Sequence, residues 1–179
     1  QTCALPIFTE AQLQPASIDL RLGSVGYRVR ASFLPTESST VMSRVEQLQL
    51  EVLDLTKPTV LEREAVYIIP LQEELTLPPG IMGKANPKST IGRLDAFTRL
   101  LTDYTGEFER VPRGYKGQLY VEVAPRAFPV IVHEGSRLNQ LRFMRGNPPP
   151  SDTALTALNE AETLVFLGED EPGQAVISR

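Results

Sequence analysis

The segment Gln14-Pro-Ala-Ser-Ile-Asp-Leu-Arg-Leu-Gly23 decides the class of fold. A proline near its start interrupts any preceding element, and apolar residues then alternate with charged ones from Ile18 to Leu22. This period of two predicts a strand with one buried face, and the glycine at its end suits a turn. The sequence therefore predicts a half-buried β-strand here.

Comparable strand patterns follow along the chain. Apolar and polar residues alternate in 48–55, and a continuous apolar run with β-branched residues occupies 65–71. The links 124–127 and 133–136 have the length of hairpin turns. Further strands are expected at 27–31, 75–80, 118–123, 128–132 and 137–143.

Helices are expected to be few and short. The segment 41–48 suits one or two helical turns, and 153–162 suits a short helix, whereas 103–113 reads as a polar loop and 163–167 as a last strand. About ten short strands, with a turn roughly every eight to twelve residues, predict an all-β sandwich or barrel. The glycines form neither a dinucleotide-binding fingerprint nor a phosphate-binding Walker A loop.

The composition fits one globular domain, or one domain with a tail, because 41% of the 179 residues are hydrophobic and 22% are charged. No apolar run is long enough to span a bilayer, so we expect a soluble protein without a membrane partner. The single cysteine, Cys3, and the single histidine, His133, argue against a disulfide and against a zinc site. The absence of an initiator methionine leaves open that the chain is a fragment.

Positive charge is concentrated in the middle of an acidic chain. The whole sequence has a net charge of −4, but Lys84–Arg145 contains eleven Lys and Arg residues against six Asp and Glu residues. The overall charge argues against a nucleic acid polymer as partner, and the basic middle favours a local anion site. The alternative is that these basic residues lie by chance on solvated strand faces.

The stretch Asn86-Pro-Lys-Ser-Thr-Ile-Gly-Arg93 is the best candidate for that anion site. Fixed positive charges and hydroxyl donors suit phosphate oxygens, and a nucleoside triphosphate carries about four negative charges. Lys88, Ser89, Thr90 and Arg93 are therefore candidate phosphate-binding residues. The alternative is a surface turn that Ser89 caps.

Glu122 is an isolated carboxylate within the apolar run Leu119-Tyr-Val-Glu-Val123. Strict alternation places it on one face with Tyr120 and Ala124, opposite the valines, so we expect it to face solvent or a cleft. In a partly closed cleft it would serve as a general acid or base. The alternative is an exposed strand carboxylate without a catalytic role.

Five motifs in a fixed order resemble a known family. They resemble those of bacterial dCTP deaminase, within the dUTPase-like superfamily, and in particular the first half of its long tandem-domain form. The resemblance covers roughly residues 11–167, and it implies a dUTPase-like distorted β-barrel of the β-clip type with a few short helices. The motifs are Gln14–Gly23, Pro87–Arg93, Gly114-Tyr-Lys-Gly117, Tyr120–Val123 and Gly135-Ser-Arg-Leu-Asn-Gln-Leu141.

The resemblance also implies an activity. It implies hydrolytic deamination of dCTP to dUTP and ammonia in the supply of dTTP, by water attack at C4 of cytosine without zinc. Glu122 would activate the water and pass a proton to the leaving ammonia, and Arg93 and Ser89 would orient the water and the base. The substrate-binding residues that it implies are Lys88, Ser89, Thr90, Arg93, Arg110 and Gln140.

Cofactor, partners and domains follow from the same resemblance. Mg²⁺ is expected on the substrate triphosphate, with dCTP as the ligand, in a cytoplasmic enzyme. A homotrimer is expected, or a pseudo-trimer with a second dUTPase-like half, with active sites between subunits. We expect an irregular N-terminal segment at 1–13, the β domain with the nucleotide site at 14–145, and at 146–179 an extension toward a missing second half.

Two alternative functions stay open. A dUTPase-type hydrolase would need an aspartate near the Gly114–Gly117 turn, which is absent, whereas Glu122 is present and favours deamination. The second alternative is a non-catalytic nucleotide-binding half-domain. It is favoured by Pro112-Arg-Gly114, which lacks the aspartate that contacts deoxyribose in the family, and by the lack of a recognisable closing tail in Gly146–Arg179.

Overall fold

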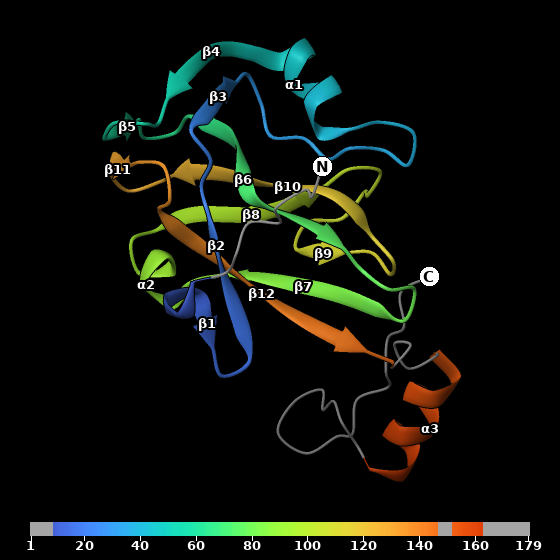
Figure 1. Cartoon of the computed structure of the whole chain (residues 1–179). Coiled ribbons are helices and arrows are strands. Elements are labelled where there is room, and N and C mark those ends of the chain that lie inside the picture. Colours follow the sequence, from blue (N-terminus) through green and yellow to red (C-terminus); the bar gives the residue numbers. More distant parts are fainter. Residues whose placement is uncertain (1–8, 147–151, 163–179) are drawn as a thin grey trace, which may run out of the picture. The chain divides into compact units, whose positions relative to one another are not determined.

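The computed structural model describes residues 9–146 and 152–162 (Figure 1). The chain divides into two compact units, Gln1–Arg145 and Gly146–Arg179. The second unit contains the helix α3 (Asp152–Ala161), where the sequence predicts a short helix. The strand predicted at 163–167 lies outside the described residues. In the described part of the chain, no helix is long and apolar enough to cross a membrane.

The first unit contains two five-stranded sheets and a two-stranded ribbon, all paired antiparallel, so the predicted all-β fold is confirmed. The first sheet has the order β1 (Leu13–Gln14), β2 (Ser17–Arg21), β12 (Arg137–Arg145), β7 (Ile81–Pro87) and β9 (Arg110–Val111). The second has the order β4 (Gln49–Asp54), β3 (Val25–Val29), β6 (Val66–Thr76), β10 (Lys116–Pro125) and β8 (Ala96–Thr102). The ribbon pairs β5 (Thr59–Leu61) with β11 (Val130–Val132).

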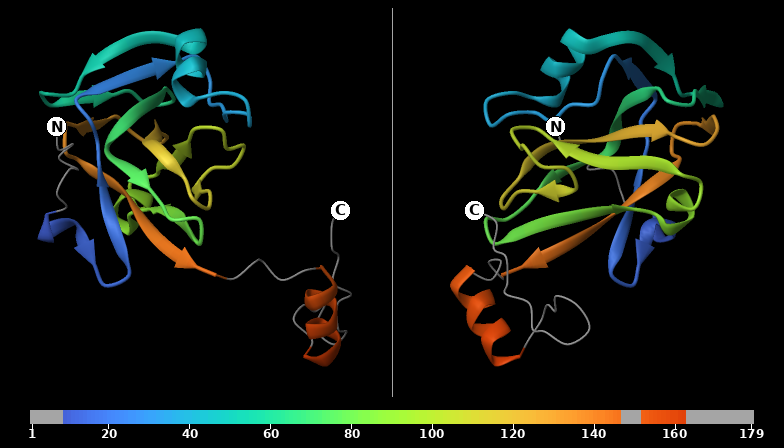
Figure 2. Two further views of the ribbon diagram at one scale, coloured as in Figure 1. Left: turned by 45° about the vertical axis from the view of Figure 1, so that its right-hand side comes forward. Right: turned by 180° about the vertical axis from the view of Figure 1, so that it is seen from behind.

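The main core fills the space between the two sheets. Figures 1 and 2 show the sheet with β7 and β12 below the sheet with β8 and β10. Leu20 and Leu141 enter this core from the first sheet, and Ile69 and Val121 enter it from the second; each is at most 1% exposed. The alternation predicted for the Ile18–Leu22 segment thus places its leucines in the core.

A second apolar cluster covers the other face of the second sheet. The helix α1 (Val41–Leu48) has the bounds that the sequence predicts, and its N-cap Thr40 accepts a hydrogen bond from Ser43 N at 3.1 Å. Val41 and Val45, one helical turn apart, are fully buried. They belong to a cluster with Val29, Phe33, Ile68, Leu101 and Tyr120. Strand β10 is consequently buried on both faces.

The strand predictions missed β5, β7, β8 and β9 and divided β6. Strand β8 was missed because the polar residues Thr98, which is buried, and Arg99, which is partly buried, interrupt the apolar pattern. The short strand β9 falls within the predicted loop 103–113. The strands predicted at 65–71 and 75–80 belong largely to one strand, β6, because the intervening Glu73 is buried in an ion pair with Arg21 at 2.7 Å.

The close contact of Gly23 with the second sheet generates a stability prediction. Gly23 N donates to Pro70 O at 2.8 Å, and a Cβ at this position would lie 2.7 Å from the same oxygen. Gly23→Ala is expected to lower the free energy of unfolding by about 1–3 kcal/mol, because backbone must move to make room. Gly80→Ala is the control, since nothing lies within 4 Å of its added Cβ. Denaturant unfolding of both variants checks this, and equal stabilities would contradict it.

Candidate active site

The predicted phosphate-binding residues lie on the turn between β7 and the short helix α2 (Ser89–Gly92). Lys88 N donates to Leu138 O on β12 at 2.8 Å, and Lys88 O accepts two N–H groups from within α2. These bonds fix the turn against the neighbouring strand. The side chains of Ser89 and Thr90 remain exposed and available to a ligand.

A groove of about 450 Å³ beside this turn brings together four of the predicted residues, Lys88, Ser89, Thr90 and Gln140. Gln140 comes from β12, and its Oε1 accepts a hydrogen bond from Ser17 Oγ at 3.2 Å. Arg142 also lines the groove and adds a positive charge that was not selected from the sequence. Its position two residues after Gln140, on the same face of a strand, is the signal that would have found it.

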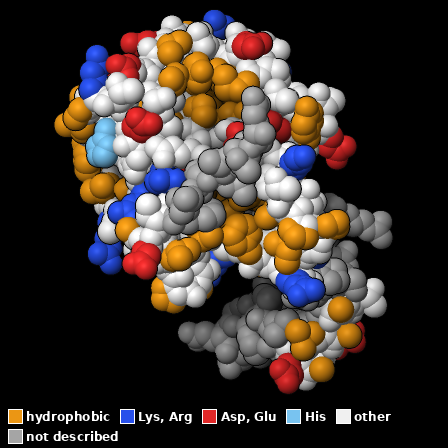
Figure 3. Space-filling model, in the orientation of Figure 1, with side chains coloured by type: hydrophobic (Ala, Val, Ile, Leu, Met, Phe, Trp, Pro, Cys, Tyr) orange, Lys and Arg blue, Asp and Glu red, His pale blue; other side chains and the backbone are white. Residues whose placement is uncertain are grey.

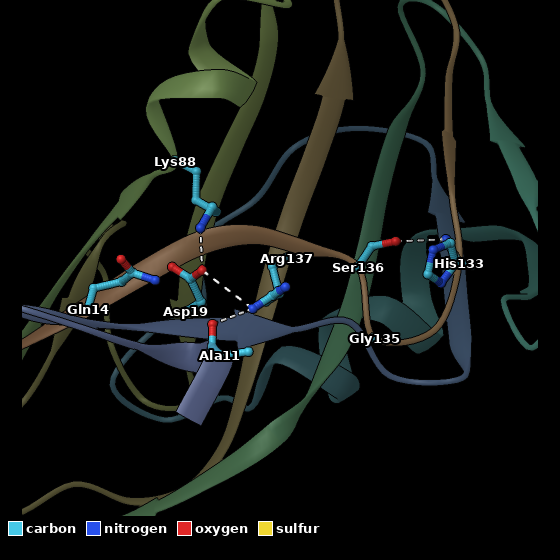
Figure 4. Close-up of a pocket in the computed structure, with 8 residues that line it drawn as sticks. All are labelled: Ala11, Gln14, Asp19, Lys88, His133, Gly135, Ser136 and Arg137. Atoms are coloured by element: carbon cyan, nitrogen blue, oxygen red, sulfur yellow. Dashed lines mark hydrogen bonds and ion pairs between the residues drawn. The ribbon is translucent and has the colours of Figure 1, made fainter. Parts of the chain in front are cut away.

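A second groove, of about 510 Å³, shares Lys88 and Gln14 with the first. Figure 4 shows Lys88 and Arg137 converging on Asp19 within it. Lys88 Nζ is hydrogen-bonded to Asp19 Oδ2, Arg137 Nη1 lies 4.0 Å from the same oxygen, and Asp19 Oδ1 is buried without a partner. In Figure 3, Lys and Arg side chains gather below the histidine, which lines this groove as His133.

The position of Asp19 corrects the sequence interpretation of β2. Alternation placed Asp19 and Arg21 on a polar face, but Asp19 is 1% exposed and the Arg21 side chain is 20% exposed. Gln12 covers part of this face. Gln12 is fully buried, and its Nε2 donates to Asp19 O and to Glu73 Oε1, both at 3.0 Å. This bonding holds Gln14 at the edge of both grooves.

Glu122 does not line either of these grooves. The expectation that it faces solvent or a cleft was wrong. Its side chain is 1% exposed, on the face of β10 that the second apolar cluster covers. Arg99, directly opposite on β8, donates to Glu122 Oε1 from Nε at 3.1 Å and from Nη2 at 2.5 Å. Glu122 Oε2 is buried without a hydrogen-bond partner.

A hollow of about 240 Å³ next to this ion pair is lined by two further carboxylates, Asp95 and Glu109. Arg99 and Gly92 of α2 line the same hollow. Burial raises the pKa of the Glu109 carboxyl to about 7, although the Leu100 amide that donates to it and the charge of Arg99 act in the opposite direction. Glu109 was not selected from the sequence, where it appears as one more charge in a polar segment.

The remaining predicted residues lie elsewhere. Arg93 caps the C-terminus of α2 and is exposed. Arg110 pairs with Glu107 at 2.5 Å on the surface, with about half of its side chain exposed (49%). Within one chain, Glu122 does not line the Lys88–Gln140 groove, although its partner Arg99 shares a hollow with Gly92 of α2. The groove suits phosphate oxygens, and Glu122 is a buried carboxylate with a free oxygen.

Comparison with solved structures defines the class of protein. The crystal structure of the 2′-deoxycytidine 5′-triphosphate deaminase from Agrobacterium tumefaciens matches with a TM-score of 0.77 and 48% sequence identity. The match covers 89% of this chain and 48% of that one, so the chain spans about half the length of the Agrobacterium protein. The fold is thus shared with a deaminase of nucleoside triphosphates.

Sequence comparison gives the family. The model of the 2′-deoxycytidine 5′-triphosphate deaminase N-terminal domain matches residues 3–147, and the chain belongs to this family, as its motifs predicted. The dUMP-forming dCTP deaminase of Mycolicibacterium smegmatis is 31% identical over 147 residues, which cover 82% of this chain and 74% of that protein. The corresponding protein of Methanosphaera stadtmanae is 25% identical over 143 residues, 77% of this chain and 68% of that protein.

Glu109 makes the stability of the fold depend on pH. Because its pKa is raised from 4.5 to about 7 on folding, the folded state holds this proton more tightly than the unfolded state between these values. The contribution of this carboxyl to the free energy of unfolding therefore falls as pH rises through this range, and it is smallest at high pH. Glu109→Gln is expected to reduce the loss of stability between about pH 5 and pH 8 by on the order of 1–2 kcal/mol.

Denaturant unfolding at a series of pH values measures this effect. Glu51→Gln is the control, because the Glu51 side chain is 60% exposed on β4. A Glu109→Gln profile parallel to that of the unchanged protein would contradict the assignment.

Proposed function

We propose that this chain carries the nucleotide site of a dCTP deaminase, which converts dCTP and water to dUTP and ammonia. The observation that carries the proposal is the family match over residues 3–147. The motif resemblance in Tyr120–Val123 implies that Glu122 is the catalytic glutamate. The relatives named as dUMP-forming suggest that pyrophosphate release should be followed in the same assay.

Glu122 is the proposed general base. As the water oxygen bonds to C4 of cytosine, Glu122 Oε2 accepts a proton from the water. The C4–N4 bond then breaks, and N4 leaves as ammonia after receiving a proton from Glu122. Of the two water protons, one leaves in the ammonia and the other ends on N3 of uracil, while the oxygen becomes O4. In this scheme Arg93 and Ser89 orient the water and the base.

The groove beside α2 is the proposed phosphate site. Lys88 and Arg142 supply positive charge there, and Ser89 and Thr90 supply hydroxyl donors. Gln140 would contact the nucleotide from β12, and Arg110 is a further proposed contact. Mg²⁺ would enter on the triphosphate of the substrate. Among residues 9–146 and 152–162, no group of three or more His, Cys, Asp or Glu side chains is placed to hold a metal ion.

The complete site is proposed to lie between two copies of the chain, or between this chain and a second dUTPase-like half. Neither Glu122 nor Arg99 lines the α2 groove of the same chain, which supports this arrangement. One copy would supply Lys88, Ser89 and Arg93, and its neighbour would supply Glu122. A homotrimer or pseudo-trimer provides such junctions between neighbours.

Replacement of the proposed base tests the function. Glu122→Gln is expected to abolish ammonia release from dCTP and to leave dCTP binding nearly intact, because the amide cannot accept the water proton. Ammonia release and nucleotide binding are measured on the same preparation. Glu51→Gln, on an exposed side chain, is the control and should turn over normally. An unchanged turnover number for Glu122→Gln would exclude this assignment.

A further inference from the structure

Glu122 occupies a place where a charge is costly. It is 1% exposed, pairs in register with Ile68 on β6 and Arg99 on β8, and lies on the face that Tyr120 shares. A buried carboxylate without a partner would strongly destabilise the fold, so a cation beside it is required. Arg99 is that cation, and it contacts only one of the two carboxylate oxygens of Glu122.

Both contacts from Arg99 fall on the same oxygen. Nε and Nη2 lie 3.1 Å and 2.5 Å from Oε1, whereas Oε2 has no hydrogen-bond partner. A fork that faced both oxygens would occupy the lone pairs that a general base needs. The observed arrangement fixes the carboxylate through one oxygen and leaves the other free to accept a proton.

Arg99 is itself held by two further segments. Its Nη2 donates to Ser32 Oγ at 3.1 Å, and its guanidinium carbon lies 4.0 Å from the centre of the Phe108 ring. The Arg99 side chain is 38% exposed, so it lies between the buried Glu122 and the surface. Three contacts from different parts of the chain thus define the direction of the guanidinium.

We infer that Arg99 is a positioning residue for deamination: it holds Glu122 Oε1, so that Oε2 is the oxygen that exchanges protons with water and ammonia. This inference rests on the proposed function. A lysine at this position would supply the charge from a flexible stem without the planar fork.

The test compares Arg99→Ala, Arg99→Lys and the unchanged chain with dCTP. Arg99→Ala is expected to lower kcat by about 10- to 100-fold with KM little changed, because the base is misplaced while the phosphate groove is intact. Added guanidinium at millimolar concentration is expected to restore part of kcat in Arg99→Ala and none in Glu122→Gln. Arg99→Lys should have an intermediate kcat.

Controls separate positioning from folding. Arg28→Ala removes an exposed cross-strand partner of Glu51 and should keep the kcat of the unchanged chain. Thermal unfolding shows whether each variant is folded, and if Arg99→Ala is not, Arg99→Lys carries the test. An unchanged kcat in a folded Arg99 variant overturns the inference, as does a loss in Arg99→Ala that guanidinium does not relieve.

The two levels of the proposal fail differently. If Glu122→Gln still releases ammonia from dCTP, the proposed function itself is wrong. If Glu122→Gln is inactive while Arg99→Ala turns over like the unchanged chain, only the positioning role of Arg99 is wrong.

Discussion

The ion pair between Glu122 and Arg99 allows the second sheet to hold a buried carboxylate. β10 lies between β6 and β8, and apolar clusters cover both faces of this sheet. A carboxylate is tolerated there because the guanidinium directly opposite neutralises it and donates two hydrogen bonds. Since well-packed apolar side chains often replace a buried ion pair without loss of stability, folding alone does not explain this pair.

The phosphate groove repeats the same arrangement. Asp19 is buried behind Lys88, as Glu122 is buried behind Arg99, and each cation is partly exposed, at 27% and 38% respectively. In both places a buried carboxylate fixes the direction of a Lys or Arg side chain that reaches the surface. Ala11 and Gln14 complete the groove, and Gln12 between them is anchored by buried hydrogen bonds to the Asp19 carbonyl and to Glu73.

Local patterns in the sequence predicted local features well. The helix α1, the turn at Lys88 and the grouping of Ser89 and Thr90 with Gln140 were all expected. Alternation also separated Glu122 from the valines, but it could not show that a helix would cover the face carrying the carboxylate. Local alternation likewise could not show that Asp19 is buried or that Arg99 of β8 has a buried partner. Each is paired with a residue distant in the sequence, Asp19 with Lys88 and Arg99 with Glu122. Such pairings depend on strand order, which no local pattern contains.

The most direct measurement is the destination of oxygen when the protein, with its neighbouring half if required, reacts with dCTP in H₂¹⁸O. Water attack at C4 places one ¹⁸O in the uracil base, at O4, for every ammonia released. Mass spectrometry of the base and phosphate fragments separates this from hydrolysis of the triphosphate. Label in the base of the product would support deamination by water attack at C4. Label found only in the phosphates, with the cytosine amine retained, would contradict it.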